Sequence, residues 1–353
     1  MLNLLKTHVK SGEIVVNVLI TGTGGGVGQS VFKSLKLSSI PTRIVTTDMH
    51  PLGVGIYRGD KGYLVPEATN PAFVDTIIKI CNDEDIEIIF IGSDPELPVF
   101  AANKLRIEQE TDAKVVISPP EKIRIGNDKW ETYLFLKNNG LPFPESALPD
   151  NRDALIEKTG FPVIIKPRGG SASKDVYIAK NREELDVFIK RVKDPIIQEY
   201  LMPEDEEYTS GAVMFDGDLL GIFTMKREIK GGNTYRGIID SHDEVRAAVE
   251  KVTRKFNQFG PSNFQMRLTD RGPVTFEINP RFSGTTAMRA FYKFNEPETV
   301  INYVLFHKKE PMNHSNGIVM RYTNEIYLPF SEYEKVKKSG TIDHSKSILP
   351  NYF

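Results

Sequence analysis

Short apolar runs and longer amphipathic stretches alternate along the first third of the chain. In chain order they are the strand VNVLI (16–20), the helix VGQSVFKSLKL (27–37), the strand TRIVTTD (42–48), the helix PAFVDTIIKICND (71–83) and the strands IEIIFIGSD (86–94) and AKVVISP (113–119). Strands that alternate with helices in this way predict a parallel, doubly wound sheet. The next stretch, PPEKIRIGND (119–128), is interpreted as the exit from that domain.

The pattern changes in the middle of the chain. A helix is predicted over KWETYLFLKNNG (129–140), with Gly140 as its C-cap. A compact α+β unit follows, with strands FPVIIKP (161–167), DVYIAK (175–180) and PIIQEYL (195–201) around a glycine-serine loop and the charged helix NREELDVFIKRVK (181–193). From about Tyr208, two long strands, a helix over 243–259 and a hairpin predict an antiparallel sheet. In the last forty residues only GIVMRYTNEIYL (317–328) is a clear strand.

Composition narrows the class of protein. The chain has 353 residues, of which 40% are hydrophobic and 26% charged, and a net charge of −2. This length predicts two or three domains, and the charge gives no reason to expect nucleic acid or a membrane as a partner. No apolar stretch approaches the roughly 18 residues that span a bilayer, and the N-terminus lacks the apolar core of a signal peptide. The single cysteine, Cys81, and the scattered histidines predict a cytoplasmic protein without a disulfide or a zinc site.

The glycine cluster TGTGGGVGQS (21–30) follows the first strand, where many nucleotide-binding folds hold a phosphate. The G-x-G-x-x-G fingerprint fails, because Val27 stands at its third glycine. The looser T-G-x-x-x-G-x-G pattern of short-chain dehydrogenases fits, with Asp48 placed for a ribose and Tyr133 and Lys137 as a Tyr-x-x-x-Lys pair. Two other pairs of this spacing occur in the chain, so the pair discriminates poorly. An NAD(P)-dependent dehydrogenase is one interpretation; glycines that serve only a tightly packed turn are the other.

The segments NFQMRL (263–268) and VTFEIN (274–279) have the alternation of a hairpin with one apolar and one polar face. The expected apolar set is Phe264, Met266 and Leu268 on the first strand and Val274, Phe276 and Ile278 on the second. Pairing of Leu268 with Val274 would place Gln265 opposite Glu277 and Asn263 opposite Asn279. The polar face then offers the hard oxygen ligands that Mg²⁺ prefers, with further ligands from phosphate and water. An exposed hairpin face is the structural alternative.

Three further features are compatible with a nucleotide. Lys166 ends an apolar strand, where a buried ammonium needs an anion, although a lysine that reaches solvent is the alternative. The loop RGGSASK (168–174) after it is small enough to fold its N–H groups over phosphates. PIIQEYL runs into a polar link, where it can present backbone groups to an adenine, with Glu207 available for a ribose. Arg281 follows the hairpin and suits a transferring phosphoryl group.

In their order and approximate spacing, Lys129, Lys166 with RGGSAS, QEYL, Glu207, Gln265 and the motif E-x-N-P-R (277–281) are similar to those of ATP-grasp enzymes. The chain resembles most the large subunit of carbamoyl-phosphate synthase, over most of residues 17–310. The resemblance implies a fold of the α/β and α+β classes: a Rossmann-like pre-ATP-grasp domain (1–125) that binds no dinucleotide, an ATP-grasp small or lid subdomain with a linker helix (126–205), and a large antiparallel subdomain with the magnesium and ATP site and a C-terminal extension (206–353).

The resemblance also implies roles for single residues. Two lysines would contact the ATP phosphates, loop 169–173 would close over them, the backbone of Glu199 and Leu201 would meet the adenine, and Glu207 would hold the ribose. In full, the implied ATP-binding residues are Lys129, Lys166, Gly169, Gly170, Ser171, Ser173, Gln198, Glu199, Tyr200, Leu201 and Glu207. The implied metal ligands are Gln265, Glu277 and Asn279, for two Mg²⁺ ions that Mn²⁺ can replace. Arg281 would stabilise the transition state that leads to an acyl phosphate.

The reaction implied is that of a carbon–nitrogen ligase: ATP phosphorylates a small-molecule carboxylate, an amine attacks the acyl phosphate, and ADP and phosphate are released. The chain has one ATP-grasp unit where the synthase subunit has two, so we do not expect it to make carbamoyl phosphate. A synthase-like enzyme that phosphorylates bicarbonate or a carbamate is the alternative within the fold. A binding protein without turnover is a further alternative, which the intact E-x-N-P-R motif argues against. A homodimer is expected from the resemblance alone.

Two segments are candidates for the substrate. MKREIKGGNTYRG (225–237) places four cations around a Gly-Gly loop, and we assign Lys226 and Arg236 to the acceptor or the transferred phosphate. A solvated basic loop explains the same pattern equally well. Ser93 and Asp94 stand at the carboxyl end of a strand, where open α/β sheets bind ligands. Asp94 would orient an amine or cap the next helix.

Overall fold

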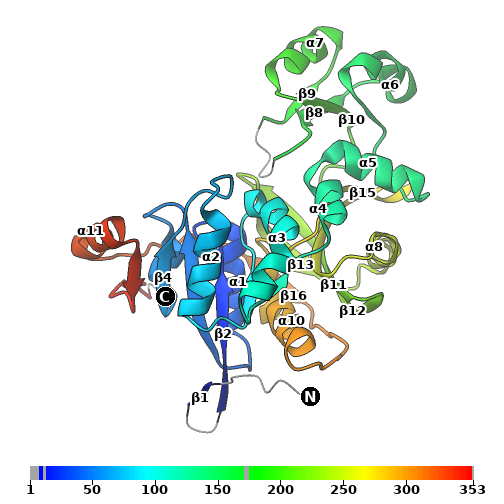
Figure 1. Cartoon of the computed structure of the whole chain (residues 1–353). Coiled ribbons are helices and arrows are strands. Elements are labelled where there is room, and N and C mark those ends of the chain that lie inside the picture. The colour runs from blue at the N-terminus through cyan, green and yellow to red at the C-terminus, as the bar shows by residue number, and fades with distance from the viewer. Residues whose placement is uncertain (1–7, 11–12, 171–174, 352–353) are drawn as a thin grey trace. The chain divides into compact units, whose positions relative to one another are not determined.

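The computed structural model describes residues 8–10, 13–170 and 175–351 (Figure 1). They form two compact units. Unit 1 contains the chain up to Ile117, then Phe282–Asn313, and the chain from Tyr322 onward; unit 2 contains Ser118–Arg281 and His314–Arg321. The chain therefore passes between the units four times.

The sheet of unit 1 is mostly parallel, as the alternating pattern predicts. Its strands are β1 (His8–Lys10), β2 (Glu13–Ile20), β3 (Thr42–Asp48), β4 (Lys61–Leu64), β5 (Ile88–Phe90), β6 (Lys114–Val116) and β17 (Thr341–Asp343). They run in the order β17-β4-β3-β2-β5-β6, with β1 paired to β2; β1 and β17 are antiparallel to their neighbours, and the other pairs are parallel. The chain order reverses between β2 and β5, so the switch point of the sheet lies at their carboxyl ends.

The helices of unit 1 come from both ends of the sequence. They are α1 (Gly26–Lys36), α2 (Phe73–Asp83), α3 (Leu97–Glu110), α9 (Thr286–Phe291), α10 (Glu296–Val304) and α11 (Phe330–Ser339), with short 3-10 turns at Val54–Tyr57 and Asp94–Glu96. Both α9 and α10 pack against α1, α2 packs against α3, and α11 packs against β17.

The sequence-based division, with residues 206–353 in one subdomain, differs from the compact units, because 282–313 and 322–353 group with unit 1. Specific contacts account for this. The N–H of Ala287 donates to Ser30 Oγ (2.8 Å), and Asn295 Nδ2 donates to the Ser34 carbonyl (3.0 Å). Arg289 and Glu296, both almost completely buried, form an ion pair of 2.8 Å between α9 and α10. A charged pair of this kind stays buried only when both partners are satisfied, so it fixes the fold of this segment.

The glycine cluster serves packing in unit 1. The Gly24 N–H donates to Asp48 Oδ2 (2.6 Å) and the His50 N–H to Asp48 Oδ1 (3.0 Å), so both carboxylate oxygens hold loops in place. A Cβ atom on Gly22 would lie 2.5 Å from the Cβ of Ser93, and one on Gly24 would lie 2.8 Å from Asp48 Oδ2. The absence of side chains lets the loop approach β3 and the end of β5 this closely. This is the packing interpretation of the cluster.

Unit 2 contains a small antiparallel sheet (top of Figure 1). Its order is β7 (Ser146–Ala147), β10 (Pro195–Glu199), β8 (Val163–Pro167) and β9 (Tyr177–Ala179). The helices α6 (Arg152–Thr159) and α7 (Arg182–Arg191) pack on it. Leu155 of α6 and Leu185 of α7 are buried in its core with Val163 and Ile165 of β8.

A six-stranded antiparallel sheet forms the rest of unit 2. Its order is β15 (Gly272–Asn279), β14 (Gly260–Thr269), β11 (Glu207–Phe215), β12 (Asp218–Lys230), β13 (Asn233–Ile239) and β16 (Gly317–Met320). The helices α4 (Pro120–Asn127), α5 (Lys129–Asn138) and α8 (Asp243–Phe256) pack on it. Val245, Val249, Val252 and Phe256 recur along α8 at helical spacing and are all buried in this core.

Two segments differ from the expectation. The predicted domain exit, 119–128, contains the helix α4, whose Ile125 belongs to the core beneath the six-stranded sheet. Pro120 stands at its first position, where the fixed backbone angle of proline favours a helix. The strand expected over 317–328 is formed only at Gly317–Met320.

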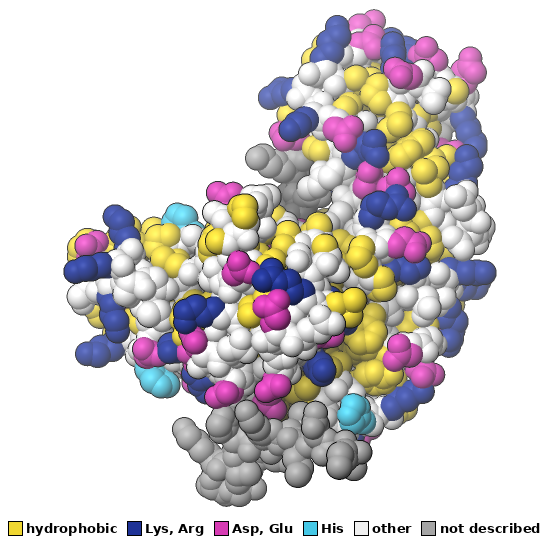
Figure 2. Space-filling model, viewed as in Figure 1, with side chains coloured by type: hydrophobic (Ala, Val, Ile, Leu, Met, Phe, Trp, Pro, Cys, Tyr) yellow, Lys and Arg dark blue, Asp and Glu magenta, His cyan; other side chains and the backbone are white. Residues whose placement is uncertain are grey.

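The surface carries charges of both signs. Figure 2 shows Lys and Arg side chains interspersed with Asp and Glu on the visible face, in agreement with the net charge of −2. Among the described helices, none combines the length and the apolar character that crossing a bilayer requires.

Candidate active site

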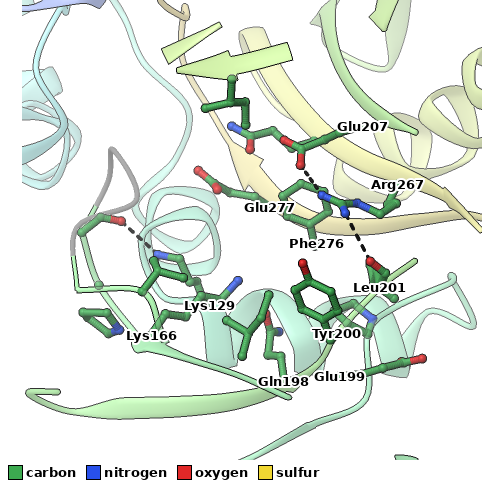
Figure 3. Close-up of a pocket in the computed structure, with 18 of the residues that line it drawn as sticks. Lys129, Lys166, Gln198, Glu199, Tyr200, Leu201, Glu207, Arg267, Phe276 and Glu277 are labelled. Atoms are coloured by element: carbon green, nitrogen blue, oxygen red, sulfur yellow. Dashed lines mark hydrogen bonds and ion pairs between the residues drawn. The ribbon is translucent and has the colours of Figure 1, made fainter. Parts of the chain in front are cut away.

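A pocket in unit 2 lies between the small and the six-stranded sheets (Figure 3). It is lined by β8 and the loop after it, by the chain that leaves β10, and by residues of β11, β12, β14 and β15. The residues of the implied site that line it are Lys129, Lys166, Gly169, Gly170, Gln198, Glu199, Tyr200, Leu201, Glu207, Gln265 and Glu277. Arg227, Arg267 and Phe276 line it as well. Ser171 and Ser173 fall outside the described residues.

Lys166 is the most unusual charge in the pocket. Its side chain is buried, its Nζ lies 6.0 Å from the centre of the Phe276 ring, and among the described residues nothing hydrogen-bonds or ion-pairs with it. Burial lowers the pKa of Lys166 to about 8, and repulsion from Lys129 adds to this; Glu277 and Glu207 oppose it. A buried ammonium without a partner is costly, so the pocket is prepared for an anion.

Lys129 and Arg168 fix the base of the loop that follows β8. Lys129 Nζ donates to the carbonyl of Gly170 (2.9 Å) and its N–H donates to that of Arg168 (3.0 Å). Arg168 Nη2 donates to Asp128 Oδ2 (2.6 Å), and Asp128 caps α5 by accepting from the Trp130 N–H (2.8 Å). Burial opposes ionisation of Asp128, but these bonds outweigh it and lower its pKa. The helix start and the loop therefore form one connected structure.

The chain that leaves β10 forms one wall of the pocket. Gln198 is buried and donates from Nε2 to Ser146 Oγ (2.8 Å). The Glu199 N–H donates to the Glu145 carbonyl (2.8 Å), while its carboxylate accepts from Arg271 Nη2 (2.6 Å). The carbonyl of Leu201 accepts from Arg267 Nη1 (3.2 Å). The backbone of this segment is thus held extended at the pocket edge.

Glu207 is held by two arginines. Arg227 donates to Glu207 Oε1 from Nε (3.1 Å) and Nη2 (2.7 Å), and Arg267 pairs with Oε2. Arg227 Nη2 also donates to Gln265 Oε1 (2.7 Å). The four side chains form one network across β11, β12 and β14, and only 12% of the Glu207 side chain is exposed. Charge-assisted bonds of this kind fix both the carboxylate and the amide in orientation.

The pairing of the hairpin residues at the site agrees with the prediction, but the pairing nearer the turn differs from it. Gln265 pairs with Glu277 and Asn263 with Asn279, as expected. Nearer the turn, however, Leu268 pairs with Pro273 rather than Val274, and the register shifts between Gln265 and Met266. One extra residue on β15, Phe276, makes up the difference and forms a bulge.

Because of the bulge, some side chains of β15 lie on the side of the sheet opposite to the one predicted. Thr275 pairs with Met266 of the core, and Val274 pairs with Arg267, so the two are exchanged relative to strict alternation. Phe276 lines the pocket beside Glu277 instead of facing the core. Figure 3 shows the ring between Glu277 and the Glu207–Arg267 pair.

Asn279 and Arg281 continue the polar row beyond the residues that line the pocket. Asn279 Nδ2 donates to Glu277 Oε1 (2.9 Å), and Arg281 Nη2 donates to Asn279 Oδ1 (3.1 Å). Glu277 is the single carboxylate among Gln265, Glu277, Asn279 and Arg281. Among the described residues, no group of three or more His, Cys, Asp or Glu side chains is placed to hold a metal. One carboxylate with amide oxygens suits a cation that takes most of its ligands from phosphate and water.

Lys226 and Arg236, which the sequence assigns to the substrate, do not line the pocket. Lys226 alternates with Arg227 along β12, faces the other side of the sheet and pairs with Glu206. Arg236 is exposed and pairs with Glu228 at 3.1 Å. Arg227 is the cation of this segment that reaches the pocket. Alternation along β12, together with the pairing of β12 with β11, identifies Arg227 as the residue that faces the pocket. The sequence alone does not reveal which residues of the two strands pair.

Family comparisons agree with this geometry. Residues 126–285 match the model of an ATP-grasp domain, and residues 18–116 match that of a PylC-like N-terminal domain. The chain is 24% identical over 289 residues to the carbamoyl phosphate synthase large chain of Pyrococcus furiosus. The matched region covers 74% of this chain and 26% of that protein. It is 23% identical over 259 residues to a carbamoyl-phosphate synthase of Methanobrevibacter smithii, covering 68% of each. The chain thus spans about a quarter of the length of the first relative.

The fold is also found in solved structures. An ADP complex of N5-carboxyaminoimidazole ribonucleotide synthetase superposes with a TM-score of 0.69 at 13% identity, over 89% of this chain and 83% of that one. The likeness shows the fold: a parallel N-terminal sheet followed by antiparallel sheets. Residues 126–285 of the chain thus form an ATP-grasp domain, which follows a PylC-like N-terminal domain in residues 18–116.

Proposed function

We propose that this protein is an ATP-dependent carboxylate–amine ligase that works through an acyl phosphate. The observation that carries the proposal is Lys166, a buried ammonium without a described partner, in a pocket that also contains Lys129 and Glu277. Such a site favours the binding of a polyphosphate, which would supply the anion that the lysine lacks.

The lining residues support a position for each part of ATP. Lys129 and Lys166 contact the phosphates, and the backbone of Gly169 and Gly170 offers further contacts to them. The backbone of Glu199 and Leu201 meets the adenine edge, and the Phe276 ring offers an apolar face near it. Glu207 holds the ribose once its contacts with Arg227 and Arg267 rearrange.

Magnesium fits the polar row of the hairpin. Gln265, Glu277 and Asn279 would hold it through oxygen atoms, and we propose two ions, which Mn²⁺ can replace. When bound, the ions neutralise charge on the phosphates during transfer. Arg281, which donates to Asn279 Oδ1 (3.1 Å) and would give up this bond when an ion takes that oxygen, stabilises the negative charge that develops on the transferred group.

The chemistry needs no protein nucleophile. A carboxylate oxygen of the substrate attacks the γ-phosphorus of ATP, and the bond to the β-phosphate oxygen breaks to release ADP. An amine then attacks the acyl carbon, phosphate leaves with the bonding electron pair, and the ammonium loses a proton. The residues of the pocket contribute by positioning and charge stabilisation.

Bicarbonate is the second candidate for the phosphorylated acid. Several sequence relatives are named carbamoyl-phosphate synthases or their large chains, and one of them is matched over 68% of its own length. The products separate the two candidates: an amine-dependent amide in one case, a carboxyphosphate-derived product in the other.

We propose that the partners of this protein are small molecules and that the protein works in the cytoplasm. Cys81 is the only cysteine and its thiol is buried, which raises its pKa to about 12 and keeps it unreactive. A homodimer remains a prediction from the resemblance.

Thermal unfolding with different ligands tests the nucleotide first. MgATP at a hundredfold excess over its Kd should stabilise the native state by about 2.7 kcal/mol, and NAD(P)⁺ should have no effect. ADP release should then require Mg²⁺, a carboxylate and an amine, which are screened in pairs alongside bicarbonate. Stabilisation by NAD(P)⁺ without any by MgATP would contradict the ligase.

A matched pair of variants makes the assay specific. Glu277→Gln removes the single carboxylate of the metal row, and ADP release should fall at least about a hundredfold, in the range seen when one electrostatic group of an active site is removed. Glu206→Gln removes a carboxylate from the opposite face of the same sheet, where it pairs with Lys226, and should retain ADP release. Equal loss in both variants would argue against the assigned site.

A further inference from the structure

Arg227 reaches into the pocket from β12, and only 9% of its side chain is exposed. Its Nη2 atom donates both to Glu207 Oε1 and to Gln265 Oε1, each at 2.7 Å. A guanidinium has donors only, so the amide of Gln265 must turn its oxygen toward Arg227. Gln265 is therefore held through the same atom that a divalent cation would need.

We propose that Arg227 is a positioning residue that competes with the divalent cation for Gln265 Oε1, and so sets the metal concentration at which the site fills. The inference rests on the proposed metal site. Two positive charges within a few ångströms repel strongly in a pocket shielded from solvent. Metal binding therefore requires the guanidinium to leave the amide oxygen, and Glu207 remains as its partner.

Arg267 resembles Arg227 in its burial and in its pairing with Glu207. Both arginines are largely buried and both pair with Glu207, Arg267 through Oε2. The remaining bonds of Arg267 go to the carbonyls of Leu201 (3.2 Å) and Pro203 (3.5 Å), not to Gln265. Loss of either arginine removes one positive charge and frees one oxygen of Glu207, but only the loss of Arg227 frees Gln265.

Titration with Mn²⁺ alone, followed by the electron paramagnetic resonance of the free ion, tests the proposal on the full chain without nucleotide. Arg227→Met should bind Mn²⁺ roughly tenfold more tightly than the wild type, because a competing charge has been removed next to the ligand atom. Arg267→Met should change the affinity by no more than about threefold, since its charge lies beyond Glu207. Lys226→Met, on the opposite face of β12, should bind as the wild type does.

Several results would overturn the proposal. Arg227→Met contradicts it if it binds Mn²⁺ no more tightly than the wild type, or shows no binding at all. Equal tightening in Arg267→Met would assign the effect to Glu207 or to net charge. Circular dichroism verifies that each variant is folded. If Arg227→Met does not fold, Arg227→Lys replaces it in the test. Lysine keeps the positive charge but lacks the several N–H donors of the guanidinium. This variant should bind Mn²⁺ more tightly than Arg267→Met does, but with a gain of less than tenfold over the wild type.

A double variant separates this inference from the proposed function. Glu277→Gln added to Arg227→Met should abolish Mn²⁺ binding. If binding persists, the metal lies elsewhere and the proposed metal site is wrong. If binding is lost but the wild type and Arg227→Met have equal affinities, the metal site stands and only the role of Arg227 fails.

Discussion

At the scale of single residues, the site contains charged side chains whose surroundings in the free protein are not the most favourable ones for each of them. Lys166 has no described partner, and Glu207 shares its charge with two arginines that a nucleotide would have to rearrange. Functional sites often retain such unfavourable arrangements, because a ligand relieves them on binding. Burial of the Lys166 ammonium should therefore lower the free energy of unfolding of the ligand-free protein.

The pH dependence of stability should reveal that cost. The pKa of Lys166 is about 8 in the folded protein, against 10.5 for an ordinary lysine. Below pH 8 both states are protonated; between pH 8 and about 10.5 the unfolded state binds more protons, so the free energy of unfolding rises with pH in this window. The rise from Lys166 is on the order of 3 kcal/mol. In Lys166→Met this contribution disappears, and the variant should be more stable than the wild type at pH 7. Urea unfolding at pH 7, 8, 9 and 10 measures both effects.

Lys226→Met is the control for that series. Lys226 pairs with Glu206 and is partly exposed, so its loss should not remove the rise above pH 8. Identical pH profiles for Lys166→Met and the wild type would show that the ammonium of Lys166 is not desolvated.

Much of the residue-level site could be predicted from the sequence, because its members follow one another in a fixed order along predictable strands. The prediction that Gln265 lies opposite Glu277 rests on alternation and on an assumed pairing of Leu268 with Val274; it is correct although Leu268 pairs with Pro273, because the bulge shifts the register. The sequence assigns Lys226 to the substrate and gives Arg227 no role, since only the pairing of β12 with β11 decides which of these two neighbours faces the pocket.

At the scale of elements, the bulge in β15 decides what the hairpin presents. Strict alternation would send Phe276 into the core, whereas the extra residue turns it to the pocket beside Glu277. The sequence VTFEIN gives no sign of this, since an apolar residue at 276 suits the core equally well. The sequence predicts only a domain exit over 119–128 and not the helix α4, because the packing of Ile125 into the core of the six-stranded sheet is not visible in the sequence.

Deletion of Phe276 should separate pairing from binding. Without the bulged residue, Thr275 can still pair with Met266 and Glu277 with Gln265, so the hairpin should form and the protein should unfold cooperatively. The aromatic wall of the pocket is lost, and the Kd for MgATP should rise about tenfold. Circular dichroism and isothermal titration calorimetry measure the two effects.

Phe276→Ala keeps the bulge and removes only the ring. It should weaken MgATP binding about as much as the deletion does. A deletion variant that fails to fold, beside a folded Phe276→Ala, would show that the bulge itself is needed for the hairpin.

At the scale of the whole molecule, the sequence predicts the kinds of sheet correctly but not how the chain is shared between the units. The tail was assigned to the large subdomain because it follows it in sequence. Its grouping with unit 1 depends on long-range contacts such as those of Asn295 with Ser34 and of Ala287 with Ser30. Contacts between residues so far apart in sequence leave no periodic pattern.

Truncation tests this sharing. A chain that ends at Arg281 lacks α9, α10 and β16, and so leaves a face of α1 and an edge of the six-stranded sheet without partners. It should be insoluble or show no cooperative thermal transition. A chain that ends at Arg321 loses α11, the edge strand β17 that pairs with β4, and the small cluster of Val336 and Ile342 with Ile56 and Tyr57, and should unfold cooperatively at a lower Tm. Two chains that behave alike would contradict the assignment of α9 and α10 to the fold of unit 1.

The fourfold passage of the chain between the units also limits how such a protein can diversify. A single genetic crossover with a relative always joins part of one unit to a foreign remainder, since neither unit is one continuous stretch of the gene. Wholesale exchange of the nucleotide-binding unit would need several simultaneous breakpoints, including one on each side of the short strand β16. New specificities in this lineage should therefore arise mainly by substitution and by loop insertion within an inherited frame, and hybrid genes made in the laboratory should be designed with paired breakpoints rather than one.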